Sequence, residues 1–564
     1  MQKNNTLSLI VVIGTLVVVG CVAFFLFYRN LFVARGLNPP VLRAQRTNSL
    51  TPTQIDRYSV FELTRTYDEA GFTNPWEQAS LGAVFTAPSG KKISIDGFYY
   101  ATDTWKIRFA PTEVGVWQWS LRFTSTNATT AKTESGTFTT VTGAQPGFLR
   151  ISTENRSRFV YDNGSLFNGI GLGECMNDVD ANGDPFNQMA VDGGVRPEGQ
   201  EAMPSDARYP GLDGYFSLYG PRGAGFNLYR WSVDNCAFKL WETISPAGNV
   251  YLAREGKWGD DLVQTLQQKK IRVWMTIFGF DPPFPDTAGT NPAQQNAIKR
   301  YIRYVVARYG ASVDVWELMN EATVREPWYI FAATYLRSID PYQHPITTSW
   351  EKPELSVIDI TAPHWYQFES EFESDKITAS RIQASLGHGQ RKPVVYGEQG
   401  NSVQNWDQRS AVRMRLRSWS AFFNEGILIF WNTSGFKNYR SPVAANIYIG
   451  PDERGFVKVL QDFTAGVSPL VRVAPVQVSQ TSTVRGYALS SPTSFMAYLT
   501  NFRDHTNPTS DVSISFNSPV RGTAVWVDPS TGGVIGSATV PVTVGANTLQ
   551  VPAFVTDIAL KLAK

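Results

Sequence analysis

Two glutamates, whose carboxylates could act in catalysis, directly follow strand-like runs. Residues 313–319 end just before Asn320-Glu321, and residues 393–397 end just before Glu398. Both runs have the apolar, β-branched and aromatic composition that is typical of buried strands. Two carboxylates on opposite sides of one cleft can cleave a glycosidic bond, because one protonates the leaving oxygen while the other attacks the anomeric carbon. We therefore interpret Glu321 and Glu398 as a candidate catalytic pair.

Such a pair requires a fold that brings residues far apart in the sequence to one edge. From about Gly147 to Asn432, β-rich runs alternate with amphipathic helical patterns, which predicts an α/β fold. The length suits a (β/α)8 TIM barrel, whose active site lies at the carboxyl ends of its strands. We expect the eight strands near residues 167–172, 226–232, 271–277, 313–319, 345–350, 357–363, 393–397 and 426–431.

Strand-like runs without helices flank this region. Short alternating runs separated by Gly and Pro predict an antiparallel β-sandwich at residues 56–142 and a second one at residues 467–564. The catalytic barrel would then span residues 143–466. Residues 1–29 are predicted to form a transmembrane anchor, and residues 30–55 a Pro-containing linker.

The N-terminal segment predicts the location of the protein. Leu7–Tyr28 carries no charge and is long enough for a transmembrane helix. A cleaved signal peptide has a shorter apolar core, so we favour an uncleaved single-pass anchor with the globular part outside the cytoplasm. Cys21 follows a Val-Val-Gly sequence that resembles a bacterial lipoprotein box, which makes a lipid anchor the alternative. Cys175 and Cys236 follow neighbouring predicted strands, and either a disulfide or two buried thiols fits them.

Composition excludes several classes of protein. The 564 residues include 51 Lys and Arg against 49 Asp and Glu, without a long basic cluster, so nucleic acid is not an expected partner. The four His and three Cys lack the short spacings of structural zinc sites. Asp178–Asp184 resembles the start of a calcium loop, but Met189 stands where the bidentate Glu would be. We expect no metal and no cofactor.

Five sites along the middle of the chain resemble clan A of the glycoside hydrolases, which are retaining enzymes built on (β/α)8 barrels. The matching residues are Arg230 after GFNLY, Asn320-Glu321, His364-Trp365-Tyr366, Glu398 and Trp431. The resemblance implies that Glu321 is the acid/base and Glu398 the nucleophile. Residues 60–141 also resemble the β-sandwich that precedes some bacterial barrels of this kind. Many relatives carry a His at the end of strand three, where this chain reads Ile277-Phe278-Gly279.

The two glutamates need opposite protonation states. Glu321 must hold a proton near neutral pH, so burial or the negative charge of Glu398 must raise its pKa. Glu398 must stay ionised, and Arg230 and the Tyr366 hydroxyl would stabilise its charge. Arg230 could also neutralise Glu317, which is predicted to point into the barrel.

The remaining site residues would contact the sugar. Asn320 would donate a hydrogen bond to the sugar 2-hydroxyl, and Trp431 would offer an apolar platform beneath the ring. His364 belongs to the same motif as Tyr366. For His364 and Trp431, an ordinary place in the core is the alternative to a role in binding.

Together these features predict a membrane-anchored retaining glycoside hydrolase that cleaves an extracytoplasmic polysaccharide or glycoconjugate. One alternative is a non-catalytic carbohydrate-binding cell-surface protein, because two β-sandwiches around a barrel also suit adhesion. The presence of both glutamates disfavours it. The other alternative is a transglycosylase, which uses the same residues and a sugar acceptor in place of water.

Overall fold

The structure is a computed structural model, and its described residues lie within one compact unit, Asn48–Lys564. No helix among them is long and apolar enough to cross a membrane. Leu7–Tyr28, Cys21, Cys175, Cys236 and the segment Asp178–Asp184 lie outside the described residues. The described residues are 51–68, 71–127, 130–174, 185–189, 191, 210–234, 237–349, 351–366, 369–387, 391–400, 409–432 and 449–563.

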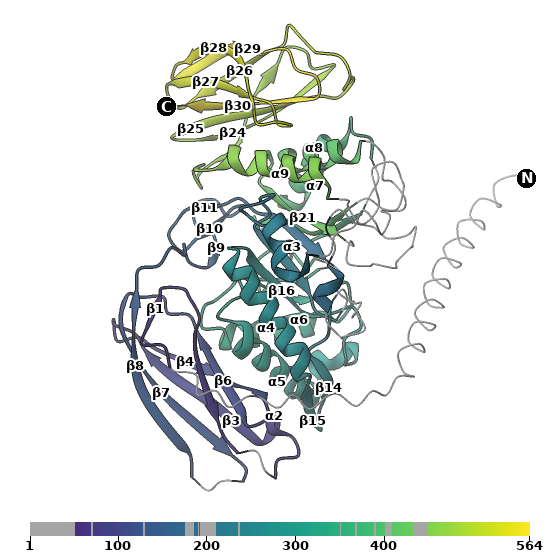
Figure 1. Cartoon of the computed structure of the whole chain (residues 1–564). Coiled ribbons are helices and arrows are strands. Elements are labelled where there is room, and N and C mark those ends of the chain that lie inside the picture. The colour runs from purple at the N-terminus through teal and green to yellow at the C-terminus, as the bar shows by residue number, and fades with distance from the viewer. Residues whose placement is uncertain are drawn as a thin grey trace, which may run out of the picture. The chain divides into compact units, whose positions relative to one another are not determined.

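Two sheets that share one core form the N-terminal part (Figure 1). On β7, Trp117, Trp119, Leu121 and Phe123 are buried while the residues between them face solvent, which is the period of a sheet with one covered face. The five-stranded sheet has the order β1 (Gln54–Asp56), β8 (Lys132–Val141), β7 (Gly115–Ser125), β3 (Ala79–Thr86) and β4 (Lys92–Asp96). The three-stranded sheet has the order β2 (Phe61–Thr66), β6 (Thr104–Phe109) and β5 (Phe98–Ala101).

Eight strands form one sheet in the middle of the chain, and every neighbouring pair in it is parallel. Helices alternate with its strands, as the sequence pattern predicts. Helix α5 begins at Pro292 because the Asn291 side chain caps it, accepting hydrogen bonds from the Ala293 and Gln294 amides, and because proline suits the first position of a helix. In sheet order, the strands are β18 (Ile346–Thr347), β17 (Val315–Met319), β16 (Arg272–Phe278), β13 (Leu228–Ser232), β12 (Ile170–Glu174), β21 (Gly426–Asn432), β20 (Val394–Gly400) and β19 (His364–Tyr366). The helices are α3 (Gly211–Tyr219), α4 (Ala253–Gln268), α5 (Pro292–Tyr309), α6 (Glu326–Ile339), α7 (Ser374–Leu386), α8 (Ser410–Phe423) and α9 (Pro451–Thr464).

The prediction of a closed (β/α)8 barrel is wrong, and the described residues contain no transmembrane helix. The residues predicted to form that helix, Leu7–Tyr28, lie outside the described part of the chain. β18 and β19 are the two edges of the sheet, and no strand pairing of the described residues joins them. Residues 357–363, which the sequence predicts as the sixth strand, form no strand, and Thr361 makes only an isolated bridge to Val394. Pro363 lacks the N–H that a ladder needs, so the strand begins one residue later, at His364. The fold is a mixed α/β fold with an open parallel sheet.

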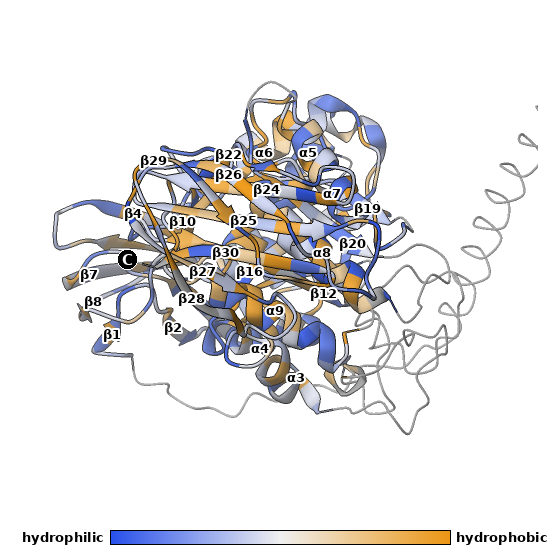
Figure 2. Cartoon of the chain, turned by 90° about the horizontal axis from the view of Figure 1, so that it is seen from above, coloured by the Kyte–Doolittle hydropathy of each residue, from blue (hydrophilic) through white to orange (hydrophobic). Residues whose placement is uncertain are grey.

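Two further sheets end the chain and share their own core. Apolar residues run along β24 and β25 in Figure 2. The buried Asp375 at the start of α7 accepts hydrogen bonds from Arg485, Tyr487 and Thr500, which fixes these sheets to the helices. The larger sheet has the order β22 (Arg472–Ala474), β24 (Val484–Ser491), β25 (Ser494–Asn501), β30 (Asp557–Ala563), β27 (Gly522–Val527) and β28 (Val534–Val542). The smaller sheet contains β23 (Gln477–Val478), β26 (Ser513–Ser518) and β29 (Gly545–Gln550).

A network of charges joins the N-terminal sheets to the central helices. Both oxygens of Asp260 on α4 accept from Arg108 on β6, at 2.7 and 2.9 Å, and from Arg308 on α5, at 3.0 and 2.9 Å. Burial raises the pKa of Asp260, but the two guanidinium groups outweigh it and hold the pKa at about 2. The ionised carboxylate therefore stabilises this junction.

We expect Asp260→Asn to lower the free energy of unfolding at pH 7 by about 3 kcal/mol, because the buried Arg308 loses its carboxylate partner and Arg108 keeps only Glu62. Since the folded pKa of about 2 lies below the ordinary 3.8, the contribution is present above about pH 4 and is lost as the pH falls toward 2. Urea unfolding followed by circular dichroism at several pH values measures both effects. Asp261→Asn is the control, since that side chain is 42% exposed and pairs with Lys257. Equal losses in the two variants would contradict this account of the junction.

Candidate active site

The carboxyl ends of the central strands bring all seven predicted site residues together. Parallel pairing sets Gly173 of β12 beside both Arg230 of β13 and Trp431 of β21, and it sets His364 of β19 beside Glu398 of β20. Asn320 and Glu321 follow β17 directly. Six of these residues are joined by the hydrogen bonds described below, and Trp431 lies beside the Arg230 guanidinium.

Arg230 is fully buried and donates hydrogen bonds to three side chains of the site. Its Nη1 donates to Glu398 Oε1 at 2.7 Å, and its Nη2 donates to Asn320 Oδ1 at 2.8 Å. Its Nε and Nη2 also hold the Glu317 carboxylate, at 2.6 and 2.7 Å. The two roles that the sequence allows for Arg230 therefore coexist.

Glu317 lies beneath the mouth of the site and is fully buried. Besides Arg230, it accepts from Trp274 Nε1 at 2.7 Å and from Thr276 Oγ1 at 3.1 Å. Burial raises the pKa of Glu317, but the charge and hydrogen bonds of Arg230 outweigh it and lower the pKa below its ordinary value. An ionised Glu317 with this many donors holds the guanidinium of Arg230 in one position.

Glu398 is 8% exposed and has a donor on each oxygen. Arg230 binds Oε1, and the Tyr366 hydroxyl donates to Oε2. Burial and the negative charge of Glu398 raise the pKa of Tyr366 well above its ordinary value, so the phenol keeps its proton and remains a donor. Both contacts stabilise the ionised form of Glu398.

Glu321 is 28% exposed and lies across the mouth from Glu398. Its backbone is in the left-handed region, with φ of 48°, and its amide donates to Ser349 Oγ at 2.8 Å. Its Oε1 lies 2.6 Å from His364 Nδ1. Burial raises the pKa of Glu321, but the hydrogen bond and charge of His364 outweigh it and lower the pKa. The raised pKa expected from the sequence is therefore wrong for this structure, because His364 was not expected to contact Glu321.

Glu321, His364 and Glu398 also form the kind of cluster that could hold a metal ion. One ligand atom from each lies within 4.8 Å of the other two. Two carboxylates and an imidazole suit a divalent transition metal. The same side chains take part in hydrogen bonds, since Glu321 contacts His364 and Glu398 contacts Tyr366.

Trp431 lies at the side of the site rather than at an open surface. Its side chain is buried, and the Arg230 guanidinium lies 5.5 Å from its ring. A Cβ at Gly173 would lie 2.0 Å from the ring, so only glycine leaves room for the indole. Its role as a sugar platform stays a prediction.

Sequence reasoning missed two parts of the site. Ser349 accepts from the Glu321 amide, and its hydroxyl donates to Asn320 Oδ1 at 3.1 Å. Its place near the end of a predicted strand is a signal that could have found it. The buried Glu174 ends β12 and accepts from the Tyr215 hydroxyl at 2.6 Å. No sequence pattern links these two residues.

Comparisons with known proteins relate the chain to glycoside hydrolases by fold. Residues 54–124 match a family described as a domain of unknown function, DUF5060. No curated protein matches the chain. A candidate glycoside hydrolase from Bacteroides vulgatus ATCC 8482 superposes with a TM-score of 0.58 and 15% identity, over 90% of this chain and 100% of that one. That likeness shows a shared fold.

Two other solved structures superpose less well. A GH30 endoxylanase from Clostridium papyrosolvens C71 has a TM-score of 0.38 and 15% identity, over 62% of this chain and 92% of that one. A GH5 xyloglucanase from Bacteroides ovatus has a TM-score of 0.36 and 10% identity, over 73% of this chain and 98% of that one.

Proposed function

We propose that the protein is a retaining glycoside hydrolase of the clan A type, with Glu398 as nucleophile and Glu321 as acid/base, and that its substrate is a polysaccharide or oligosaccharide. The carboxylate pair carries the proposal, because an oxygen of Glu321 lies within 4.8 Å of one of Glu398. Retaining glycosidases have carboxyl groups about 5–5.5 Å apart, whereas inverting ones leave about 6.5–9.5 Å for a water molecule. The observed spacing favours direct attack by Glu398.

In the first step, Glu398 attacks the anomeric carbon and the glycosidic bond breaks. The attacking oxygen must be ionised, and the donors Arg230 and Tyr366 favour that form. As the oxygen forms its new bond, its negative charge decreases. Because Arg230 is also fixed by Glu317, it needs no rearrangement during the reaction.

The leaving oxygen takes a proton from Glu321, and Glu321 receives that proton from His364. The 2.6 Å contact between Glu321 Oε1 and His364 Nδ1 lets one proton reside on either group. A bound sugar excludes water, and a low-dielectric site favours a neutral pair over an ion pair. Substrate binding therefore moves the proton onto Glu321. After the leaving group departs, ionised Glu321 activates the water that releases the sugar from Glu398.

Asn320 is oriented to bind the sugar. Its Oδ1 accepts from both Arg230 and Ser349, which leaves the amide N–H groups to donate. A hydrogen bond from this amide to the 2-hydroxyl would strengthen as the ring flattens in the transition state.

The configuration of the first product tests this proposal. A panel of aryl glycosides identifies a substrate, and proton NMR then follows the anomeric signal of the released sugar before it mutarotates. We expect the configuration of the substrate to be retained, because two successive displacements occur at the same carbon. Release of the opposite anomer would contradict attack by Glu398 and point to a water molecule between the glutamates. Analysis of longer products separates hydrolysis from transglycosylation. The location outside the cytoplasm stays a prediction.

A further inference from the structure

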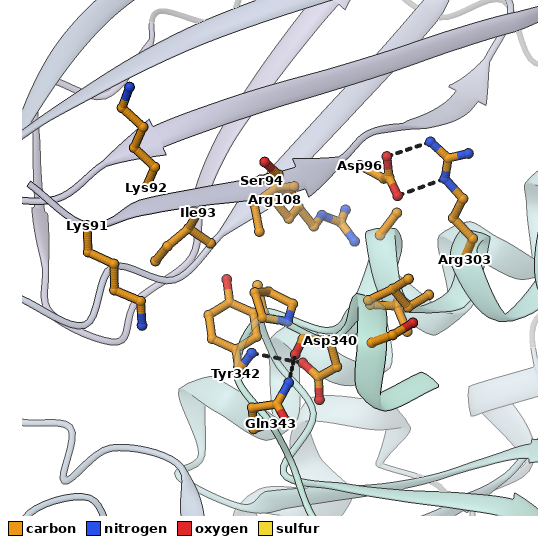
Figure 3. A pocket seen from close by; sticks show the side chains of 17 residues that line it. Lys91, Lys92, Ile93, Ser94, Asp96, Arg108, Arg303, Asp340, Tyr342 and Gln343 are labelled. Atoms are coloured by element: carbon orange, nitrogen blue, oxygen red, sulfur yellow. Dashed lines mark hydrogen bonds and ion pairs between the residues drawn. The ribbon is translucent and has the colours of Figure 1, made fainter. Parts of the chain in front are cut away.

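A cavity lies between the N-terminal sheets and the central helices, and none of the seven candidate active-site residues lines it. It has a volume of about 440 Å³ and runs along β4, the edge strand of the five-stranded sheet (Figure 3). Residues 91–96 form one wall, and α5, the end of α6 and the turn that follows it, at residues 340–343, form the other. The cavity therefore lies where the N-terminal sheets meet the central helices.

A wider hollow of about 770 Å³ continues from this cavity over the outer face of β3, β4 and β7. Ser94, Ile95, Asp96 and Arg303 line both, so the two form one groove, which we call the β4 groove. Gly82 lies in its floor, paired with Asp96 on one side and Arg122 on the other. The missing side chain at Gly82 deepens the hollow between these two charged residues.

The β4 groove has an excess of positive charge. Lys91, Lys92 and Arg122 line it and are exposed, and no ion pair of theirs occurs in the described part of the chain. Its carboxylates are all paired. Asp96 binds Arg303 at 2.6 Å, Glu134 binds Arg65 at 2.6 Å, and Asp340 lies 2.9 Å from His344. A ligand of complementary charge must therefore be anionic.

Hydroxyl groups make up much of the remaining polar lining. Pairing across the sheet sets Ser120 opposite Ser135 and Ser80 opposite Thr124, all on the outer face. Hydroxyls both donate and accept hydrogen bonds, as sugar hydroxyls do. Among the described residues that line the groove, Tyr342 is the one aromatic side chain. Neutral sugars depend on aromatic faces for much of their binding, so this lining favours a sugar that carries charge.

We propose that the β4 groove binds a chain of an anionic glycan, at a site separate from the candidate active site. The cations would contact carboxylate or sulfate groups on the glycan, and the serine and threonine hydroxyls would contact its hydroxyls. Binding there does not require the glutamate pair, so the proposal stands or falls independently of the proposed hydrolysis.

Titration calorimetry on the full chain tests the proposal, with Glu398→Ala present to prevent cleavage. Oligogalacturonate supplies carboxylates, sulfated dextran oligosaccharide supplies sulfates, and neutral dextran oligosaccharide supplies neither. We expect binding of at least one anionic glycan but not of neutral dextran, and weaker binding in high salt. Lys91→Gln with Lys92→Gln, and separately Arg122→Gln, should each weaken binding about tenfold. Lys376→Gln is the control, because that lysine is 60% exposed and lies on α7.

Several results would overturn the proposal. One is the absence of binding to both anionic glycans at low salt. Another is unchanged affinity in the groove variants, which would place the glycan elsewhere. Equal affinity for a DNA duplex would show general attraction of polyanions instead of glycan recognition. Tighter binding of an acidic peptide would show that the edge strand β4 captures a peptide strand.

Discussion

Glu398→Ala should lower kcat by at least about 10⁴-fold on every substrate, because no other group can form the bond to the anomeric carbon. The loss should not depend on the leaving group. A good leaving group replaces the proton from Glu321, but it does not replace the attacking oxygen. Steady-state kinetics on aryl glycosides of graded leaving-group acidity measures this.

Loss of folding would give the same kinetic result, so it must be excluded separately. In Glu398→Ala, Arg230 keeps Glu317 and Asn320 as partners, and we expect a folded protein by circular dichroism. Glu373→Ala is the matched control, since that carboxylate is 41% exposed on the surface. Activity of a folded Glu398→Ala variant within tenfold of the wild type would exclude Glu398 as nucleophile.

Glu321→Ala should divide substrates by their leaving groups. For a natural oligosaccharide, kcat/KM should fall about 10³-fold, because the departing alkoxide needs a proton. For a dinitrophenyl glycoside, whose leaving group departs without one, bond cleavage should proceed at close to the wild-type rate. The glycosyl enzyme should then accumulate, because no base activates water.

Azide distinguishes the two glutamates by the product that it forms. In Glu321→Ala, azide enters the vacated space and attacks the glycosyl enzyme, which gives a glycosyl azide of retained configuration. In Glu398→Ala, azide takes the place of the nucleophile and gives the inverted product. If NMR showed the inverted glycosyl azide from Glu321→Ala and the retained one from Glu398→Ala, the acid/base and the nucleophile would be exchanged.

The sequence predicts the strands that carry the site well where an apolar run is uninterrupted. The runs predicted at 226–232, 271–277 and 426–431 correspond to β13, β16 and β21, with ends that differ by one or two residues. Their hydrophobic residues face either the sheet interior or the helices, so the pattern is strong.

The sequence predicts the segment between β18 and β19 poorly. Residues 357–363 are apolar enough to resemble a strand, but here the chain makes individual hydrogen bonds, as when the Asp359 amide donates to Ile346 O at 2.7 Å. The Asp359 side chain also accepts from the Ile346 amide and from Arg337. Such contacts depend on tertiary packing, which residue patterns along the chain do not record.

Electrostatics within the site were also only partly predictable. Arg230 is always charged and lies near the end of a strand, so the sequence is enough to predict that it contacts a carboxylate. The contact of His364 with Glu321 joins β19 to the segment that follows β17, and it reverses the expected direction of the Glu321 pKa. This contact could be found only from the three-dimensional arrangement of the site.

Trapping the glycosyl enzyme tests the central claim most directly. A 2-deoxy-2-fluoro glycoside with a good leaving group slows both steps, because fluorine destabilises the positive charge of the transition states, and the covalent intermediate then accumulates. Mass spectrometry of the intact protein should show the addition of one fluorosugar. Peptide mapping should locate it on Glu398. A label on Glu321 or on any other residue, or turnover without a covalent intermediate, would contradict the proposed mechanism.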